Sequence, residues 1–251
     1  MQVTGTDAAS QAVRVTNAGG SSPFVIICDH ASNALPSGFD RLGLTAKDFD
    51  RHIAWDPGAL PVARQLATSL DAALVESRVS RLIIDCNRPL EAHDLIPALS
   101  ETTIIPGNEN LSSAERERRI SASWRPFHDA ISALVDERLA AGRDTWLVSV
   151  HSFTPVYKGV SRPWQIGIIH DDDTRLAAPM IAALQKQAGL TVGVNEPYSP
   201  ADRVYFTLER HARSRGLPCA MIEVRNDEIR DQPGQHRWAD LLAGLFAGLV
   251  E

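Results

Sequence analysis

The sequence is poor in cysteine, and its three cysteines do not have the spacing of a disulfide framework or a zinc ribbon. Cys28, Cys86 and Cys219 each lie in or at the end of an apolar run. Buried, unpaired thiols are typical of proteins kept in a reducing compartment. We therefore expect a cytoplasmic protein without disulfide bonds.

Long apolar runs and basic clusters are also missing. No stretch reaches the roughly 18 apolar residues that span a membrane, and the N-terminus lacks the basic-then-apolar pattern of a signal peptide. The formal net charge is −6, and lysine and arginine form no cluster. We therefore expect no membrane partner and no nucleic-acid partner.

Several common catalytic motifs are absent as well. No G-x-G-x-x-G follows the first apolar run, which disfavours a dinucleotide-binding fold. The sequence contains no H-E-x-x-H, no G-x-S-x-G and no C-x-x-C. These absences remove the commoner metalloprotease, esterase and zinc-ribbon interpretations.

What is present is the pattern of one α/β domain. Hydrophobic residues make up 44% of the 251 residues, enough for a sizeable core. Apolar runs alternate with helical patterns over residues 23–251. This alternation predicts three layers, with helices on both faces of a mostly parallel sheet. Residues 1–22 are polar and rich in glycine and serine, and we expect a loose N-terminal arm there.

The expected elements follow from hydrophobic periodicity and helix-start signals. The predicted strands are Phe24–Cys28, Ala73–Glu76, Leu82–Asp85, Thr145–Val150, Gln165–Ile169, Thr191–Val194 and Cys219–Val224. The predicted helices are Pro57–Leu70 with Asp56 as N-cap, a long helix from Ser112 to about Ala141, Asp173–Gln187, Phe206–Ser214 and His236–Leu249.

Two histidines and a glutamate lie at the ends of predicted core strands. His30 follows the first strand, His151 follows Thr145–Val150, and Glu223 lies near the end of the last strand. Open α/β sheets bind ligands at such strand ends. Histidine and carboxylate ligands with one open position are typical of catalytic zinc. The three residues therefore suggest a metal-assisted hydrolase, in which Glu223 is a candidate general base.

A third metal ligand is needed, and the sequence leaves two choices. Asp56 and His52 both lie in the segment before the first predicted helix. Asp56 is also explained by a plain capping role ahead of Pro57. The residues alone therefore leave the ligand open.

Arginines are the remaining clue. Arg81, Asn87 and Arg88 surround one predicted strand, and Arg225 follows Glu223 by two residues, which places both on one face of a continuing strand. Guanidinium groups bind carboxylates through paired hydrogen bonds. We therefore expect these four residues to bind an anionic substrate.

Six segments in order resemble the motif series of the N-formylglutamate amidohydrolase family. The resemblance covers about residues 23–227, which is most of the chain. The segments are Cys28–Asn33, His52–Gly58, Ser80–Leu82 with Asp85–Arg88, His151–Pro155, Asn195–Ser199 and Ile222–Asp227.

The resemblance implies a phosphorylase/hydrolase-like fold, of the zinc exopeptidase kind, with a mixed central sheet. A more distant likeness, to zinc-dependent cell-wall amidases, implies that His30, Asp56 and His151 hold one Zn²⁺ and that Glu223 is the base. Asp56 is thereby favoured over His52, although an aspartate is shorter than the glutamate of those amidases.

The activity implied by the resemblance is hydrolysis of the N-formyl amide of glutamate to formate and glutamate. One alternative is a hydrolase of another N-acyl amino acid or a small peptide, which would use the same machinery. Another is a catalytically inactive homologue that binds a small molecule. Metal content and substrate profiling separate the three.

Overall fold

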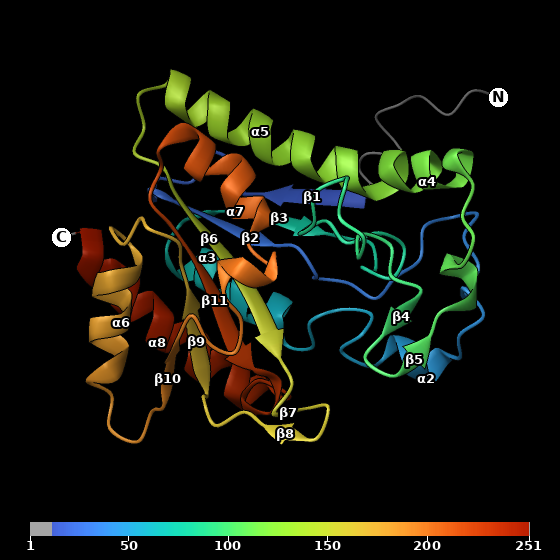
Figure 1. Cartoon of the computed structure of the whole chain (residues 1–251). Coiled ribbons are helices and arrows are strands. Elements are labelled where there is room, and N and C mark those ends of the chain that lie inside the picture. The colour runs from blue at the N-terminus through green and yellow to red at the C-terminus, as the bar shows by residue number, and fades with distance from the viewer. Residues whose placement is uncertain (1–11, 251) are drawn as a thin grey trace.

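The computed structural model describes residues 12–250, which form a seven-stranded mixed sheet with helices on both faces (Figure 1). The strand order across the sheet is β1-β3-β2-β6-β11-β9-β10. The strands are β1 Val13–Thr16, β2 Phe24–Cys28, β3 Ala73–Ser77, β6 Trp146–Phe153, β9 Ile166–Ile169, β10 Val192–Val194 and β11 Cys219–Arg225.

The four central strands, β3, β2, β6 and β11, are parallel to one another. β1 and β9 pair antiparallel with β3 and β11, and β10 is parallel to β9. The expected fold class, a mostly parallel mixed sheet with helices on both faces, is therefore confirmed.

Each face of the sheet is covered by its own helices. α3 (Ala59–Ser69), α6 (Ala177–Gln185) and α8 (Gln232–Val250) pack on one face. α5 (Arg125–Ala140) and α7 (Phe206–His211) pack on the other. Side chains of a strand alternate between the faces, so Phe24 and Ile26 of β2 join the first layer while Val25 and Ile27 join the second. β2 is buried along its whole length, as strands covered on both faces are.

A third apolar cluster lies under the loops beside the sheet, around Leu82, Ile83 and Trp124. The smaller elements of the chain lie outside the main sheet. They are α2 Ala46–Phe49, the hairpin of β4 Leu99–Ser100 and β5 Thr103–Ile104, α4 Ser113–Arg119, and the hairpin of β7 Val156–Tyr157 and β8 Val160–Ser161, which follows β6. Short 3₁₀ turns cover Pro106–Asn108, Pro200–Asp202, Arg213–Arg215 and Asn226–Glu228.

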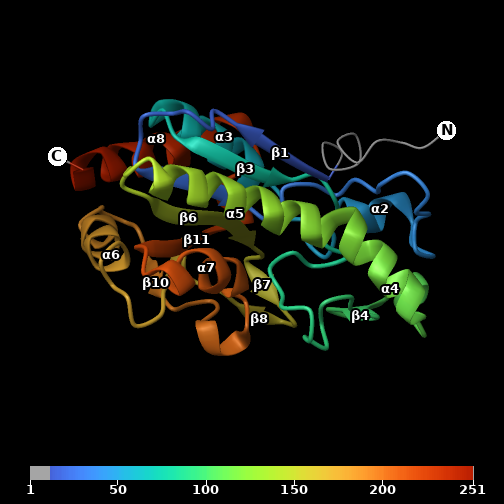
Figure 2. The same ribbon diagram turned by 90° about the horizontal axis from the view of Figure 1, so that it is seen from above.

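α4 and α5 form one long rod along the side of the molecule (Figure 2). A π-helical turn, Ile120–Trp124, joins them. Ser112 caps the rod by accepting a hydrogen bond from the backbone N–H of Glu115, as expected. The indole N–H of Trp124 donates to the carbonyl of Arg88 at 2.9 Å, so the turn also fixes the loop that follows β3.

The predicted strand Leu82–Asp85 is wrong, because this segment is a turn. The side-chain oxygen of Ser80 accepts from the N–H of Leu82, and the carbonyl of Ser80 accepts from the N–H of Ile83. The apolar side chains of this segment are buried in the third apolar cluster, under the loops. The apolar run therefore arises from packing between loops, and the segment does not pair with a strand. The other six predicted strands are present.

The first helix begins later than predicted. α3 starts at Ala59 with Gly58 as N-cap, and Asp56 does not cap it. Gly58 has a φ of +83°, and a Cβ at this position would lie 2.4 Å from the carbonyl oxygen of Ile229. Only glycine fits there, and the resulting turn leaves the carboxylate of Asp56 free for other contacts. The bounds of α6, α7 and α8 lie within four residues of those expected.

The expected loose arm is wrong over residues 13–16, which form β1 and pair with β3. β1 is an edge strand, and most of its residues are exposed. It therefore lacks the continuous apolar run by which the other strands were predicted. Residues 1–11 lie outside the described part of the chain. The three cysteines are free and buried, as expected. None of the described helices is long and apolar enough to cross a membrane.

Candidate active site

Four side chains meet above the carboxyl ends of the central strands. His30 lies two residues beyond β2, and His151 and Glu223 lie opposite each other in the parallel ladder of β6 and β11. Both strands continue two residues past these side chains, so His151 and Glu223 lie within the strands and not after them. Asp56 is held beside them, because its N–H donates to the carbonyl of His30 at 2.9 Å.

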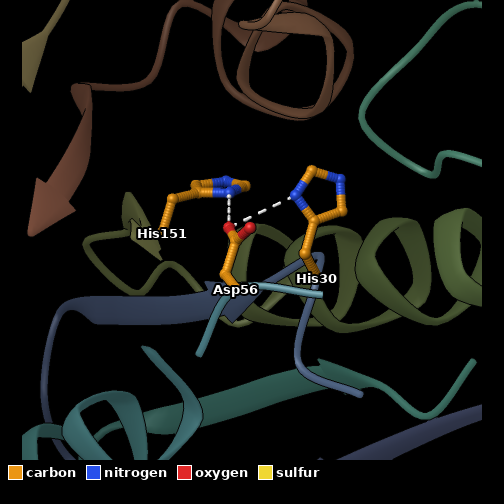
Figure 3. A group of neighbouring side chains, drawn as sticks. All are labelled: His30, Asp56 and His151. Atoms are coloured by element: carbon orange, nitrogen blue, oxygen red, sulfur yellow. Dashed lines mark hydrogen bonds and ion pairs between the residues drawn. The ribbon is translucent and has the colours of Figure 1, made fainter. Parts of the chain in front are cut away.

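Asp56 lies between the two histidines (Figure 3). Its Oδ2 is 2.9 Å from His151 Nδ1 and 3.3 Å from His30 Nδ1. All three residues are buried, and one ligand atom from each lies within 4.8 Å of the others. The structure therefore brings together the three residues expected to hold a metal.

The outer nitrogen of each histidine meets a second carboxylate. His30 Nε2 lies 2.8 Å from Asp85 Oδ1, and His151 Nε2 lies 3.1 Å from Asp29 Oδ2. Carboxylates in this position fix the orientation of metal-binding imidazoles. Neither aspartate was predicted to have a role; the signals in the sequence are that Asp29 directly precedes His30 and that Asp85 lies two residues before Asn87.

Arg81 and His52 form the next layer around Asp56. Arg81 Nη1 lies 3.1 Å from Asp56 Oδ1, and its other amino group donates to the carbonyl of His52. His52 Nε2 lies 2.6 Å from the carbonyl oxygen of Ser152 and 3.5 Å from Asp56 Oδ1. His52 is thus engaged with the backbone, and Asp56 is the better placed ligand.

Charge contacts set the protonation of this cluster. Burial lowers the pKa of His151, but its contacts with Asp29 and Asp56 outweigh burial and raise the pKa well above its usual range. Burial raises the pKa of Asp56, but Arg81 and His30 hold it well below the usual value. The pKa of His52 falls to about 4, because the ring is buried beside Arg81.

Glu223 is buried and chemically distinct from the aspartates. Burial raises its pKa to about 7, against the opposing charge of His151. Its Oε2 has no hydrogen-bond partner among the described residues. Arg225, the partner that a plain ion pair would need, contacts Asp227 and Glu228 instead. A carboxylate with a pKa near neutrality and a free oxygen is suited to accepting a proton.

A cavity of about 260 Å³ opens over these side chains. It is lined by the following residues: His30, His52, Ile53, Asp56, Arg81, Asp85, Asn87, Arg88, Asp94, Pro97, Leu99, Ser100, Glu101, His151, Ser152, Tyr157, Tyr198, Val204 and Glu223. Two tyrosines are among these residues: Tyr157 follows His151 by six residues, and Tyr198 lies in one of the six segments of the sequence resemblance.

Three of the four residues expected to bind substrate line this cavity. Arg81, Asn87 and Arg88 face it, and Arg88 is braced by Asp94 at 2.8 Å. Asn87 is braced differently, because its amide donates to the carbonyl of Val204. Arg225 is not among the lining residues. Its guanidinium pairs with Asp227 at 2.7 Å and donates to the carbonyls of residues 162–164, which is a structural arrangement.

The donor set fits a divalent metal ion. Two imidazoles and one carboxylate are the usual protein ligands of catalytic zinc. Glu223 Oε2 is buried beside this set and has no hydrogen-bond partner among residues 12–250, whereas Asp56 Oδ1 is paired with Arg81 at 3.1 Å. Buried polar atoms are almost always satisfied, so a carboxylate oxygen without a protein partner at this point fits a site that takes an ion or a polar ligand.

A mixed sheet with helices on both faces, and a buried His/Asp/His cluster beside a free carboxylate at its strand ends, is an arrangement suited to hydrolysis. Residues 22–230 match the family model of N-formylglutamate amidohydrolase. The match covers most of the chain, and the protein therefore belongs to the N-formylglutamate amidohydrolase family. The resemblance expected from the six segments is confirmed.

The solved structures that are similar to this one include the following two. A gene product from Agrobacterium tumefaciens is 46% identical, with a TM-score of 0.93 over 97% of this chain and 96% of that chain. The N-formylglutamate amidohydrolase from Ralstonia eutropha JMP134 is 21% identical, with a TM-score of 0.65 over 94% of this chain and 96% of that chain. The second likeness shows a shared fold. No curated protein matches the chain significantly.

Proposed function

We propose that this protein is a metal-dependent amidohydrolase that cleaves the N-formyl amide of glutamate, giving formate and glutamate. The observation that carries the proposal is the buried cluster of His30, Asp56 and His151 beside the free carboxylate of Glu223. Membership of the family supports the amide substrate.

His30, Asp56 and His151 would hold one divalent metal ion, with Zn²⁺ the best fit to their donor atoms. When bound, such an ion polarises the amide carbonyl and makes a water molecule acidic near neutral pH. Asp29 and Asp85 hold the two imidazoles in place through their outer nitrogens. The remaining chemistry falls to Glu223 and the cationic side chains of the cavity.

Glu223 acts as the general base. Its pKa near 7 lets it take a proton from water and return that proton to the leaving amine at the same pH. Arg81 lies close enough to Asp56 to place its positive charge near the reacting carbonyl. There it stabilises the negative charge that develops on the amide oxygen.

Asn87 and Arg88 bind a carboxylate of the substrate. Both line the cavity, and Trp124 and Asp94 hold the loop and the guanidinium of Arg88 in position. A guanidinium fork suits a carboxylate, which is present in every N-acyl amino acid. Arg225 has no part in this, since its contacts lie outside the cavity.

The decisive experiment measures metal content and activity on the purified protein. We expect about one equivalent of zinc or a similar ion, as a three-ligand site holds. Release of formate from N-formylglutamate should exceed release of acyl group from N-acetylglutamate and N-succinylglutamate. His151→Ala should lose both metal and activity while it remains folded. Full metal occupancy in that variant would remove His151 from the ligand set.

A further inference from the structure

A row of residues crosses the sheet at the level of the proposed base. Pairing in register places side by side, across β6, β11, β9 and β10, the residues His151, Glu223, Gly167 and Gly193. Residues paired in this way point to the same face of a sheet. The first two carry side chains that line the cavity, and the two glycines carry none. The row therefore leaves space next to Glu223 for another part of the chain.

The segment that carries Tyr198 fills this space. A Cβ at Gly167 or Gly193 would collide with the carbonyl oxygen of Glu196, so only glycine lets the segment lie this close to β9 and β10. The N–H of Asn195 donates to a carbonyl of β9 at 3.0 Å and ties the segment to the sheet. Tyr198 follows Glu196 by two residues and lines the cavity. The packing of the glycines thus holds Tyr198 in the cavity wall, beside the proposed base.

Arg162 fixes the hydroxyl of Tyr198 from behind. Arg162 is only 7% exposed, and its Nη1 donates to the hydroxyl oxygen at 3.1 Å. Its central guanidinium carbon lies 4.8 Å from the ring centre of Tyr198 and 4.6 Å from that of Tyr157. Cation–π contacts of this kind hold a guanidinium in place. Arg162 is not among the residues that line the cavity, so it reaches the cavity only through the tyrosine.

The contact with Arg162 leaves the phenolic proton of Tyr198 free. A phenol both accepts and donates hydrogen bonds, whereas a guanidinium can only donate. Among residues 12–250 the hydroxyl has no other hydrogen-bond partner, so its proton is available to a ligand in the cavity. Burial and the charge of Glu223 raise the pKa of the phenol to about 12, and the proton therefore stays bound at neutral pH. Tyr198 is thus a neutral hydrogen-bond donor with a fixed position.

We propose that Tyr198 is a further catalytic residue, whose hydroxyl donates to the oxygen of the scissile amide as negative charge develops on it, and that Arg162 is its positioning residue. The inference rests on the proposed function and deepens it, because it adds a neutral donor beside Glu223 to the positive charge that Arg81 supplies beside Asp56. A donor that is in place before the reaction stabilises the transition state more than the substrate. The expected result of losing it is slower turnover with little change in KM.

The first test uses Tyr198→Phe, which removes the hydroxyl and keeps the ring. With the metal-loaded enzyme and N-formylglutamate, kcat should fall about 10²- to 10³-fold, the range for losing one such donor, while KM and metal content stay close to those of the parent protein. The matched control is Tyr205→Phe, because Tyr205 is buried in the core, contacts Cys219 through its hydroxyl and does not line the cavity. An unchanged kcat in Tyr198→Phe, or a loss confined to KM, would overturn the role.

A double-mutant cycle tests Arg162. Arg162→Met should lower kcat, and Arg162→Lys should lower it less, because an ammonium group can still donate to the hydroxyl of Tyr198. When either change is combined with Tyr198→Phe, little further loss is expected, because a positioning group acts only through the group that it holds. Losses that multiply in the double variants would show that Arg162 acts independently of Tyr198 and would refute its positioning role.

A binding measurement keeps this inference separate from the proposed function. 2-(Phosphonomethyl)glutarate carries a tetrahedral, negatively charged phosphonate where N-formylglutamate carries its amide, and glutarate lacks this group. In calorimetry on the metal-loaded proteins, Tyr198→Phe should bind the phosphonate at least about tenfold more weakly than the parent and show no change in its affinity for glutarate. If this difference is found but the parent cleaves no N-formyl amino acid, only the proposed activity fails. Equal phosphonate affinities in the two proteins would refute the role of Tyr198.

Discussion

At the scale of single residues, the two histidines of the site are each held from behind by an aspartate. Asp85 lies 2.8 Å from His30, and Asp29 lies 3.1 Å from His151. The hydroxyl of Thr207 donates in turn to Asp29. The cluster is thus built outwards in layers, and its outer layer sets the orientation of the inner one.

This layering gives the first prediction, which concerns Asp85→Asn. The amide keeps the shape of the side chain but loses the charge that orients His30, so zinc affinity should fall about 10- to 100-fold. Competition with a chromogenic chelator measures the affinity directly. Asp136→Asn, at an exposed carboxylate paired with Arg215, is the control. Unaltered zinc affinity in Asp85→Asn would show that the contact with His30 has no orienting role.

The second prediction concerns the base. Glu223→Gln keeps the side-chain volume but accepts no proton, so turnover should fall about 10²- to 10⁴-fold while the metal stays bound. Steady-state kinetics and metal analysis on the same sample provide the measurement. Loss of the metal would make Glu223 a ligand, and unchanged turnover with metal bound would exclude it as the base.

How far the sequence predicts the site depends on what each residue contacts. His30, His151 and Glu223 could be found because each lies in, or just after, a clear core strand. The prediction for Arg225 was wrong. Alternation along a strand predicts on which face of the sheet Arg225 lies, but not that its guanidinium pairs with nearby Asp227 and Glu228. Asp85 could not be found from local pattern, because its partner His30 is distant in sequence and meets it only in the fold.

At the scale of elements, α5 and α7 are joined by two buried histidines. His128 Nδ1 and His211 Nε2 lie 2.8 Å apart, and His128 Nε2 lies 2.9 Å from the carbonyl oxygen of Cys86. Burial holds the pKa of His128 at about 4 and that of His211 at about 3. Both rings are therefore neutral in the folded protein at pH 7.

The third prediction follows from these lowered pKa values. In the unfolded chain the same histidines titrate near pH 6.5, so between about pH 6.5 and 4 the unfolded state binds more protons than the folded state. The free energy of unfolding should therefore fall as the pH is lowered through this window, and be fully present above it. Urea denaturation at a series of pH values gives the dependence.

His211→Gln tests the origin of that dependence. Glutamine does not titrate, so the slope of stability against pH between about pH 6.5 and 4 should become shallower, even if the variant is less stable at pH 7. His236→Gln is the control, because His236 lies on α8, which packs on the opposite face of the sheet from α5 and α7. An identical slope in both variants would place the acid sensitivity elsewhere in the chain.

Helices and strands could be predicted where a segment is both buried and paired through its backbone. The prediction failed where a segment has only one of these two properties. Leu82–Asp85 has the apolar composition of a strand, but its side chains are buried by loops and its backbone bonds locally through Ser80. β1 is paired in the sheet but exposed, so it lacks the apolar signal. α3 begins after Gly58, because Gly58 packs against the backbone of Ile229 where no side chain fits. The sequence around Gly58 does not predict this contact.

At the scale of the whole molecule, the proposed metal joins segments far apart in sequence. Its ligands would come from the loop after β2, the turn before α3 and the carboxyl end of β6. An ion that binds only the folded state stabilises that state according to its concentration.

The fourth prediction is therefore a metal-dependent melting temperature. Zinc at about 100 times its dissociation constant should add about 2.7 kcal/mol, which raises the Tm of a chain of this size by roughly 5–10 °C. Differential scanning calorimetry with and without a chelator measures the shift. Asp56→Asn should melt at nearly the same temperature under both conditions, and a full zinc-dependent shift in that variant would argue against the proposed ligand set.

The place of β11 in the sheet has a consequence for synthesis on the ribosome. β11 pairs with β6 on one side and β9 on the other, yet both neighbours are made before it. Until residues 219–225 emerge, the edges of β6 and β9 stay unpaired, and the pair β9–β10 has no place to dock. Unpaired edges are where chains associate wrongly. β11, the strand that covers both edges, also carries Glu223. A nascent chain therefore acquires its proposed base in the same step in which the edges of β6 and β9 become paired.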